Sequence, residues 1–248
     1  MKKIFSIIAM AAILAACSNE DDFTVARMVT VTLDCAFDAK TTRGSETLYT
    51  QLYDRIASKE LIADKYNLVF TNKETGEKST LYGNWSDNTQ FEIKTGNYTV
   101  QGSSTAEGVG IQDKCSISFN TEVSVTSNTN RLILKADYDC FLIIFDKRTV
   151  KDASITYLFS SNLIERHFFE YGGMLYGFSG NLYNDKIAQY QKLRIEYTDG
   201  SIEERQSSKL NTKKGEYYII EGTRSSSSEL LGNSTINFTI GQMRRGQL

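Results

Sequence analysis

The sequence predicts an all-β protein built from two tandem β-sandwich domains, with one helix inserted in the first. Short runs alternate between apolar and polar residues along most of the chain, and clusters of Gly, Asn and Ser separate these runs. Such alternation is typical of half-buried strands joined by turns. The later half of the chain also repeats short motifs of the first half in the same order, which indicates a duplicated unit.

Length and composition agree with a globular protein of this kind. The 248 residues are 40% hydrophobic and 23% charged, enough for two ordinary domains with their own cores. The balance of 28 basic and 30 acidic residues argues against nucleic acid as a partner, because such proteins carry a basic surface. The single histidine, His167, excludes mechanisms that need two imidazoles.

The N-terminal sequence is typical of a secretory signal. Lys2 and Lys3 precede an apolar run that is too short to span a membrane, so residues 1–16 are predicted to be a signal peptide. The run ends in Leu14-Ala15-Ala16-Cys17, which resembles the lipobox of bacterial lipoproteins. Cys17 is therefore the predicted lipidation site, and the alternative is an unmodified cysteine at the end of the signal.

An acidic tether, residues 17–23, follows the lipobox. Its run Ser18-Asn19-Glu20-Asp21-Asp22 resembles the export signal that takes Bacteroidota lipoproteins to the outer face of the outer membrane. The alternative is a solvated linker. We expect a protein held on the outer membrane by its N-terminal lipid and facing the cell exterior.

The strands follow in order. Apolar residues alternate with polar ones from Val29 to Phe37, as in a half-buried strand. Similar runs occur at Leu68-Val69-Phe70, Phe91-Glu92-Ile93, Tyr98-Thr99-Val100, Ser116-Ile117-Ser118-Phe119 and Arg131-Leu132-Ile133-Leu134. Thr75-Gly76 and Thr95-Gly96-Asn97 supply residues that tolerate positive φ, so they predict tight hairpins and an antiparallel arrangement.

One segment departs from this pattern. Residues 46–63 contain no Gly, and Leu48, Leu52 and Ile56 fall four apart, which predicts an amphipathic helix. We expect its Leu and Tyr stripe to cover one end or edge of the first sandwich. A helix that binds a partner is the alternative.

The internal repeat sets the domain boundaries. Gly96-Asn97-Tyr98 matches Gly215-Glu216-Tyr217, and Leu68-Val69-Phe70 matches Leu193-Arg194-Ile195. Chance matching of short β motifs is the alternative. The predicted domains are residues 24–136 and residues 137–248.

The two copies end differently. The first continues to the run at 131–134, whereas the second stops soon after its corresponding strand and is predicted to lack a final one. An incomplete sandwich exposes an edge that another chain's strand can fill. The alternatives are that residues 131–134 belong to the second unit or that the C-terminal tail pairs irregularly.

Three cysteines fall in the predicted domains: Cys35, Cys115 and Cys140. Cys35 and Cys115 both face inward by the alternation of their strands, so they can meet in one core. Three single pairings are open, and buried free thiols are favoured because cysteine packs as a small hydrophobe. No Cys-x-x-Cys is present, so we predict neither a metal nor a cofactor.

No motif nominates a catalytic centre. His167 lies among carboxylates in the run 165–170, but no nucleophile is indicated and a structural or surface role is favoured. The glycine-rich stretch 171–180 has neither the dinucleotide nor the P-loop spacing. We therefore predict that the protein is not an enzyme.

Two groups of aromatic residues are candidate ligand-binding residues. The first group falls in a stretch expected to be a loop inserted in the second domain: Tyr171, Tyr176, Phe178 and Tyr183, with Phe168 and Phe169 beside them. Aromatic side chains in loops favour recognition, but the analogy with the helix of the first domain favours a role in capping the sandwich core. The second is Trp85, the only tryptophan, set among polar turn residues where it can stack on a sugar or act as a packing anchor.

The lipobox, the acidic tether and two β units with Gly-x-Tyr strands together resemble the fimbrillin-like surface lipoproteins of Bacteroidota. The resemblance implies two transthyretin-like Greek-key sandwiches, adhesion or pilus-type assembly and, in some members, proteolytic removal of an N-terminal strand that frees a groove. The expected function is that of a structural or adhesive surface protein, an accessory subunit of fimbria-like assemblies. Its expected partners are other fimbrial subunits or host and surface glycans, and a glycan-binding surface lipoprotein is the alternative.

Overall fold

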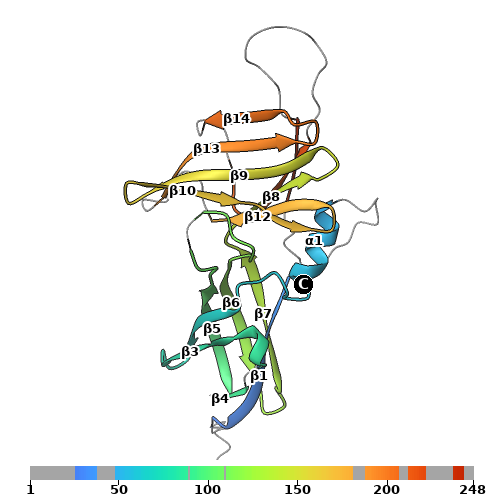
Figure 1. Ribbon diagram of the computed structural model, residues 1–248. Helices are drawn as coiled ribbons and strands as arrows, with labels where there is room; N and C mark the ends of the chain where they lie inside the picture. The colour runs from blue at the N-terminus through green and yellow to red at the C-terminus, as the bar shows by residue number, and fades with distance from the viewer. Residues whose placement is uncertain are drawn as a thin grey trace, which may run out of the picture.

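The computed structural model confirms the all-β architecture with one helix. It describes residues 26–37, 48–88, 90–108, 110–180, 188–206, 212–221 and 237–242. The predicted signal peptide, Cys17 and its tether, and Tyr183 lie outside the described residues. Figure 1 shows an elongated body in which an N-terminal group of strands and a C-terminal group follow one another, with the helix at their junction.

The N-terminal group is one sheet in the order β3-β2-β5-β6-β7-β1-β4. Its strands are β1 (Met28–Ala36), β2 (Lys65–Asn72), β3 (Lys78–Asn84), β4 (Gln90–Lys94), β5 (Gly96–Ser104), β6 (Ile117–Val125) and β7 (Arg131–Tyr138). β7 joins two layers, because its first half pairs in parallel with β1 and its last three residues pair with β6. The sheet thereby folds over a core that includes Leu33, Leu68 and Val100.

The C-terminal group has two sheets, in the orders β10-β9-β13-β14 and β11-β12-β8-β15-β16. Its strands are β8 (Phe141–Asp146), β9 (Val150–Phe159), β10 (Asn162–His167), β11 (Phe169–Tyr171), β12 (Met174–Ser179), β13 (Ala188–Tyr197), β14 (Ile202–Gln206), β15 (Glu216–Glu221) and β16 (Asn237–Gln242). Phe145, Ile155 and Leu193 pack in the core between the two sheets.

The two groups repeat one strand pattern. β1 pairs antiparallel with β4 and parallel with β7, and β8 pairs antiparallel with β12 and parallel with β15. In the same way β2 lies between β3 and β5, and β9 lies between β10 and β13. The duplicated architecture that the sequence indicates is therefore present, while the exact boundaries at residues 136 and 137 stay a prediction.

The motif matches used to infer the repeat were wrong, because the matched motifs lie in strands that do not occupy equivalent positions in the two groups. The Gly-x-Tyr at 96–98 begins β5, whereas the one at 215–217 begins β15, which takes the place of β7. Glycine at positive φ followed by a strand is a general way to enter a strand from a turn, so it does not distinguish one strand from another. The missing final strand is also corrected, because β15 fills that position and β16 pairs along its other edge.

The helix α1 (Leu48–Ala57) confirms the predicted apolar stripe. Tyr49, Leu52, Tyr53 and Ile56 are its buried residues. They belong to one hydrophobic cluster that contains residues of both groups of strands. α1 therefore does more than cover one sandwich: it fills the junction between the two groups (Figure 1).

The strand β8 explains why the two groups form one body. All six of its residues are buried. Phe141, Ile143 and Phe145 face the core of the C-terminal group, whereas Leu142 and Ile144 belong to the cluster shared with α1 and the N-terminal group. A strand that is buried on both faces of its sheet is apolar along its whole length. One face of β8 is covered by the other sheet of the C-terminal group, and the other face is covered by α1 and the N-terminal group.

A segment from the N-terminal group also enters the C-terminal group. We name residues 110–116, between β5 and β6, the strap. The backbone of Gln112 exchanges two hydrogen bonds with that of Phe178 in β12, at 2.8 and 2.9 Å. The side chain of Ile111 is 2% exposed and packs within the core of the C-terminal group. The strap thus carries one residue of the first group into the core of the second.

Candidate functional site

Trp85 is placed inside the N-terminal core. It begins a short 3₁₀ turn, Trp85–Asp87, after β3, and its side chain is 6% exposed. Its ring lies 4.6 Å from that of Tyr66 and 5.7 Å from that of Phe119, measured between centroids. A sugar stacks on an open ring face, and in this structure neighbouring rings cover Trp85. Glycan binding at Trp85 stays a prediction.

The aromatic residues expected in a loop lie in strands instead. Tyr171 ends β11, and Tyr176 and Phe178 belong to β12. The sequence of this segment predicts a loop for two reasons. Gly172 and Gly173 form a tight hairpin at positive φ. β12 is buried on both faces, so its sequence does not alternate between apolar and polar residues. Tyr176 and Phe178 are buried in the cluster at the junction.

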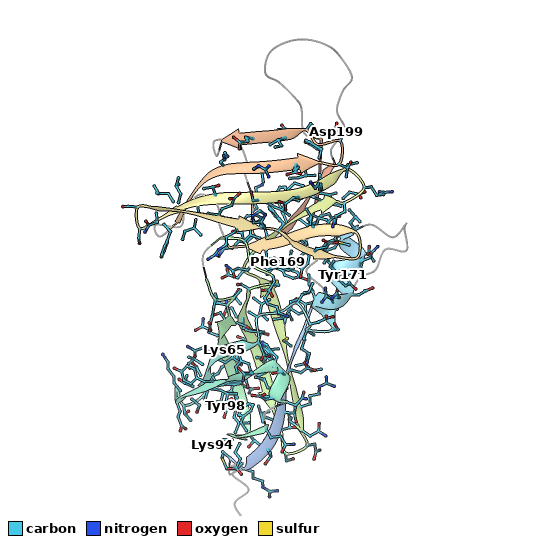
Figure 2. The ribbon with its side chains drawn as sticks, in the orientation of Figure 1. Lys65, Lys94, Tyr98, Phe169, Tyr171 and Asp199 are labelled. Atoms are coloured by element: carbon cyan, nitrogen blue, oxygen red, sulfur yellow. The ribbon has the colours of Figure 1, made fainter. Side chains whose placement is uncertain are left out.

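The side chain of Tyr171 is exposed and contacts α1. The guanidinium of Arg55 in α1 lies 4.0 Å from the centre of the Tyr171 ring, in a cation–π contact. Arg55 also forms an ion pair with Glu60. Figure 2 shows Phe169 and Tyr171 at the level of the junction. The structure thus brings three of the predicted residues, Tyr171, Tyr176 and Phe178, to the contact between the two groups, and ligand binding by them stays a prediction.

His167 is the last residue of β10. Its Nδ1 is 3.1 Å from a carboxylate oxygen of Asp152, and its side chain is largely exposed. Ser154 is opposite His167 in the register of β9 and β10, but its hydroxyl donates to Glu165 at 2.5 Å. Within the described part of the chain, no three His, Cys, Asp or Glu side chains are grouped to hold a metal ion.

The buried carboxylate of Asp34 fixes the first strand in place, and no motif in the sequence predicts it. Asp34 in β1 accepts hydrogen bonds from Lys59, just after α1, and from Arg131 at the start of β7. The amide of Cys35 donates to the same carboxylate at 2.8 Å. Burial by itself raises the pKa of Asp34, but the two cations outweigh it and the pKa lies below its ordinary value.

The strand edges are the accessible surfaces that can take another chain. Among the strands that the structure describes, β10 pairs only with β9 and so lies at an edge of its sheet, and nearly all of its side chains are exposed. Leu163 at its start is 69% exposed. An exposed edge with an apolar side chain is a template for strand addition.

A groove opens in the N-terminal group between its two edge strands, β3 and β4. The groove has a volume of about 280 Å³ and is lined by residues of these and neighbouring strands: Met28, Phe70, Leu81, Phe91, Ile93 and Tyr98. An ion pair at 3.1 Å between Glu77 and Lys94 links the two sides. Figure 2 places Lys94 at the end of the body farthest from the C-terminal group. Phe70, Phe91, Ile93 and Tyr98 lie in strands that the alternation predicts, whereas Leu81 lies in β3, which the sequence analysis did not predict. These side chains converge only because the sheet folds over.

No protein-family model matches the chain, and no curated protein matches it. Two similar solved structures are fimbrial proteins. One is a fimbrial assembly protein from Parabacteroides distasonis, with 10% identity and a TM-score of 0.42 over 88% of this chain and 96% of the other. The second is the tip fimbrial protein Mfa3 from Porphyromonas gingivalis, with 9% identity and a TM-score of 0.39 over 86% of this chain and all of the other.

Because both TM-scores lie below 0.5, we base the proposed function on the sequence and geometry of this chain. Among the described residues, no helix has the length and apolar character needed to cross a bilayer.

Proposed function

We propose that this protein is a structural or adhesive subunit of the cell surface, anchored in the outer membrane through lipid on Cys17. The observation that carries the proposal is the shape of the body. β1 begins at the end farthest from the C-terminal group, so an anchor ahead of β1 holds the strands β8–β16 away from the membrane (Figure 1). The shared core makes the body stiff, as a display subunit requires.

The leader and domains fit this arrangement. Removal of residues 1–16 leaves Cys17 as the first residue, and seven residues, 17–23, can span at most roughly 25 Å at about 3.5 Å each. The proposed domains, residues 24–136 and 137–248, then follow one another outward from the membrane. No cofactor is needed for this function, and the protein is not proposed to be an enzyme.

Contacts with other subunits are proposed to run through strand edges, as in an accessory subunit of a fimbria-like assembly. β1 lies inside its sheet, between β4 and β7, and buries Val31 and Leu33. Withdrawal of β1 would leave both neighbours with unpaired backbone groups and an open apolar groove. A strand from another copy could fill that groove and restore the pairing.

Light scattering on the chain from Ser18 to Leu248, before and after limited trypsin treatment, tests the proposal. Lys40 and Arg43 follow β1 in the sequence, so cleavage there cuts β1 from the rest of the chain. We expect a monomer before cleavage and larger species after it. The matched control is the double variant K40A/R43A, which should stay monomeric under the same treatment. A cleaved wild-type chain that remains a monomer would refute assembly by strand exchange.

A further inference from the structure

Cys115 and Cys140 face each other across the junction of the two groups. The last pair in the ladder of β6 and β7 is Ile117 with Tyr138. One step beyond it, the amide of Asp139 donates to the carbonyl of Ser116 at 2.9 Å. The same register places Cys115 directly opposite Cys140.

Both backbone groups of Cys115 and the carbonyl of Cys140 form hydrogen bonds with other segments. The amide of Cys115 donates to Leu61 at 2.6 Å, and its carbonyl accepts from Ala63 at 2.9 Å. The carbonyl of Cys140 accepts from Gly215 at 2.9 Å. This is the pattern of a non-hydrogen-bonded antiparallel pair, in which the Cα atoms are about 4.5 Å apart and the side chains are close. That separation lies within the range that a disulfide spans, roughly 4.4–6.8 Å.

The two sulfur atoms are already in contact. They lie 3.3 Å apart, and both thiols are free in this structure. Cys35 is buried in the same hydrophobic cluster, in β1, but no contact of its sulfur with either of the other two sulfurs is seen in the described part of the chain. The pair is therefore selected by register from the three pairings that the sequence left open.

We propose that Cys115 and Cys140 form a disulfide when the chain folds in the presence of a thiol–disulfide oxidant. One thiolate attacks a sulfur of the oxidant and releases one reduced thiol of the oxidant, leaving a mixed disulfide. The second cysteine then attacks the protein sulfur of that mixed disulfide and releases the second oxidant thiol. Two protein thiols lose two protons and two electrons, and one oxidant disulfide is reduced to two thiols.

The reaction belongs to folding, because the folded protein protects this pair. The two residues are 0% and 1% exposed. Burial raises the pKa of the Cys115 thiol well above its ordinary value, so the thiolate that performs the exchange is scarce once the junction has closed. Burial likewise raises the pKa of Cys35 to about 12, which leaves it an inert third thiol.

The proposed disulfide would stabilise the contact between the two groups of strands. Cys115 is near the end of the strap, and Cys140 immediately precedes β8, so the link joins the strap to the first strand of the C-terminal group. It closes a loop of 25 residues. A loop of that length predicts a rise in melting temperature of about 10 °C for the oxidised over the reduced chain.

The experiment uses the chain from Ser18 to Leu248, unfolded and reduced, then refolded with oxidised and reduced glutathione. Alkylation in guanidinium without reductant should modify one thiol per chain. Tryptic digestion should then release residues 115–131 linked to residues 136–147, with the alkylated cysteine in residues 28–40. The melting temperature should fall when the refolding is repeated in reductant.

The variants separate the possible outcomes. Cys35→Ala should keep the linked peptides and leave no thiol to alkylate, whereas Cys115→Ser should lose the link and leave both Cys35 and Cys140 alkylated. Three alkylated thiols in the refolded wild type, or a link through residues 28–40, would overturn the proposal. Oxidation of the folded, reduced chain as fast as that of the refolding chain would overturn the assignment of the step to folding.

Discussion

Ile111 in the strap gives the sharpest test of the shared core. Its side chain is buried in the C-terminal group, although its segment leaves and re-enters the N-terminal group. Ile111→Ala removes three buried carbons, worth about 2.4 kcal/mol at roughly 0.8 kcal/mol each. The cavity that remains adds to this loss, so we expect a decrease of about 3 kcal/mol in the free energy of unfolding. For a chain of this size the melting temperature should fall by about 6–12 °C.

Calorimetry and guanidinium unfolding measure this effect. The wild type should unfold in one transition, because the two groups share a hydrophobic cluster. The matched control is Ile133→Ala, the same chemical change at a side chain that is 54% exposed, where we expect a loss within about 0.5 kcal/mol. If Ile111→Ala cost no more than Ile133→Ala, the strap would not be part of the second core and the reasoning would fail.

Three further substitutions test other contacts. Gly177→Ala would place a methyl group against the side chain of Ile111, so guanidinium unfolding should show a loss of about 1–3 kcal/mol, and a neutral result would contradict the close packing of strap and β12. Asp34 has a lowered pKa when folded, so its carboxylate stabilises the protein above its unfolded pKa and this contribution is lost as the pH falls through the folded pKa. Asp34→Asn should therefore be less stable at pH 7 and lose less stability than the wild type between about pH 5 and pH 2; parallel curves would argue against it. Trp85→Ala should cost about 3–5 kcal/mol of stability, and unchanged stability with lost retention on a glycan affinity gel would favour a binding role instead.

The elements that the sequence predicts correctly have one buried and one exposed face. β7 alternates exposed and buried residues along almost its whole length, and β2 does the same. In α1 the buried residues fall on one stripe of the helix. In each case the partner is a single core on one side, so the periodicity of the sequence matches the geometry of the element.

The C-terminal group was harder to predict because its central strands have no exposed face. β8 and β12 are buried throughout, and a continuous apolar run shows neither its register nor its neighbours. The sequence could not predict the burial of the strap for a different reason. Ile111 sits between Gly110 and Gln112, a composition typical of a loop, and its burial is decided by strands far away in the sequence. Only the long-range pairing of Gln112 with β12 identifies that segment.

The double cover of β8 bears on the proposed role at the cell surface. If the N-terminal group were removed, Leu142 and Ile144 would lie on an open sheet face, together with Tyr176 and Phe178 of β12. An apolar face of that kind aggregates or binds another surface, so the C-terminal group needs the first group as its cover. We therefore expect the two groups to move as one, so that a contact made at the edge strand β10 would be transmitted through the shared core to β1 and the anchor proposed ahead of it. A hinge between the two groups of strands would interrupt this transmission, and the strap, α1 and the Cys115–Cys140 contact all oppose such a hinge.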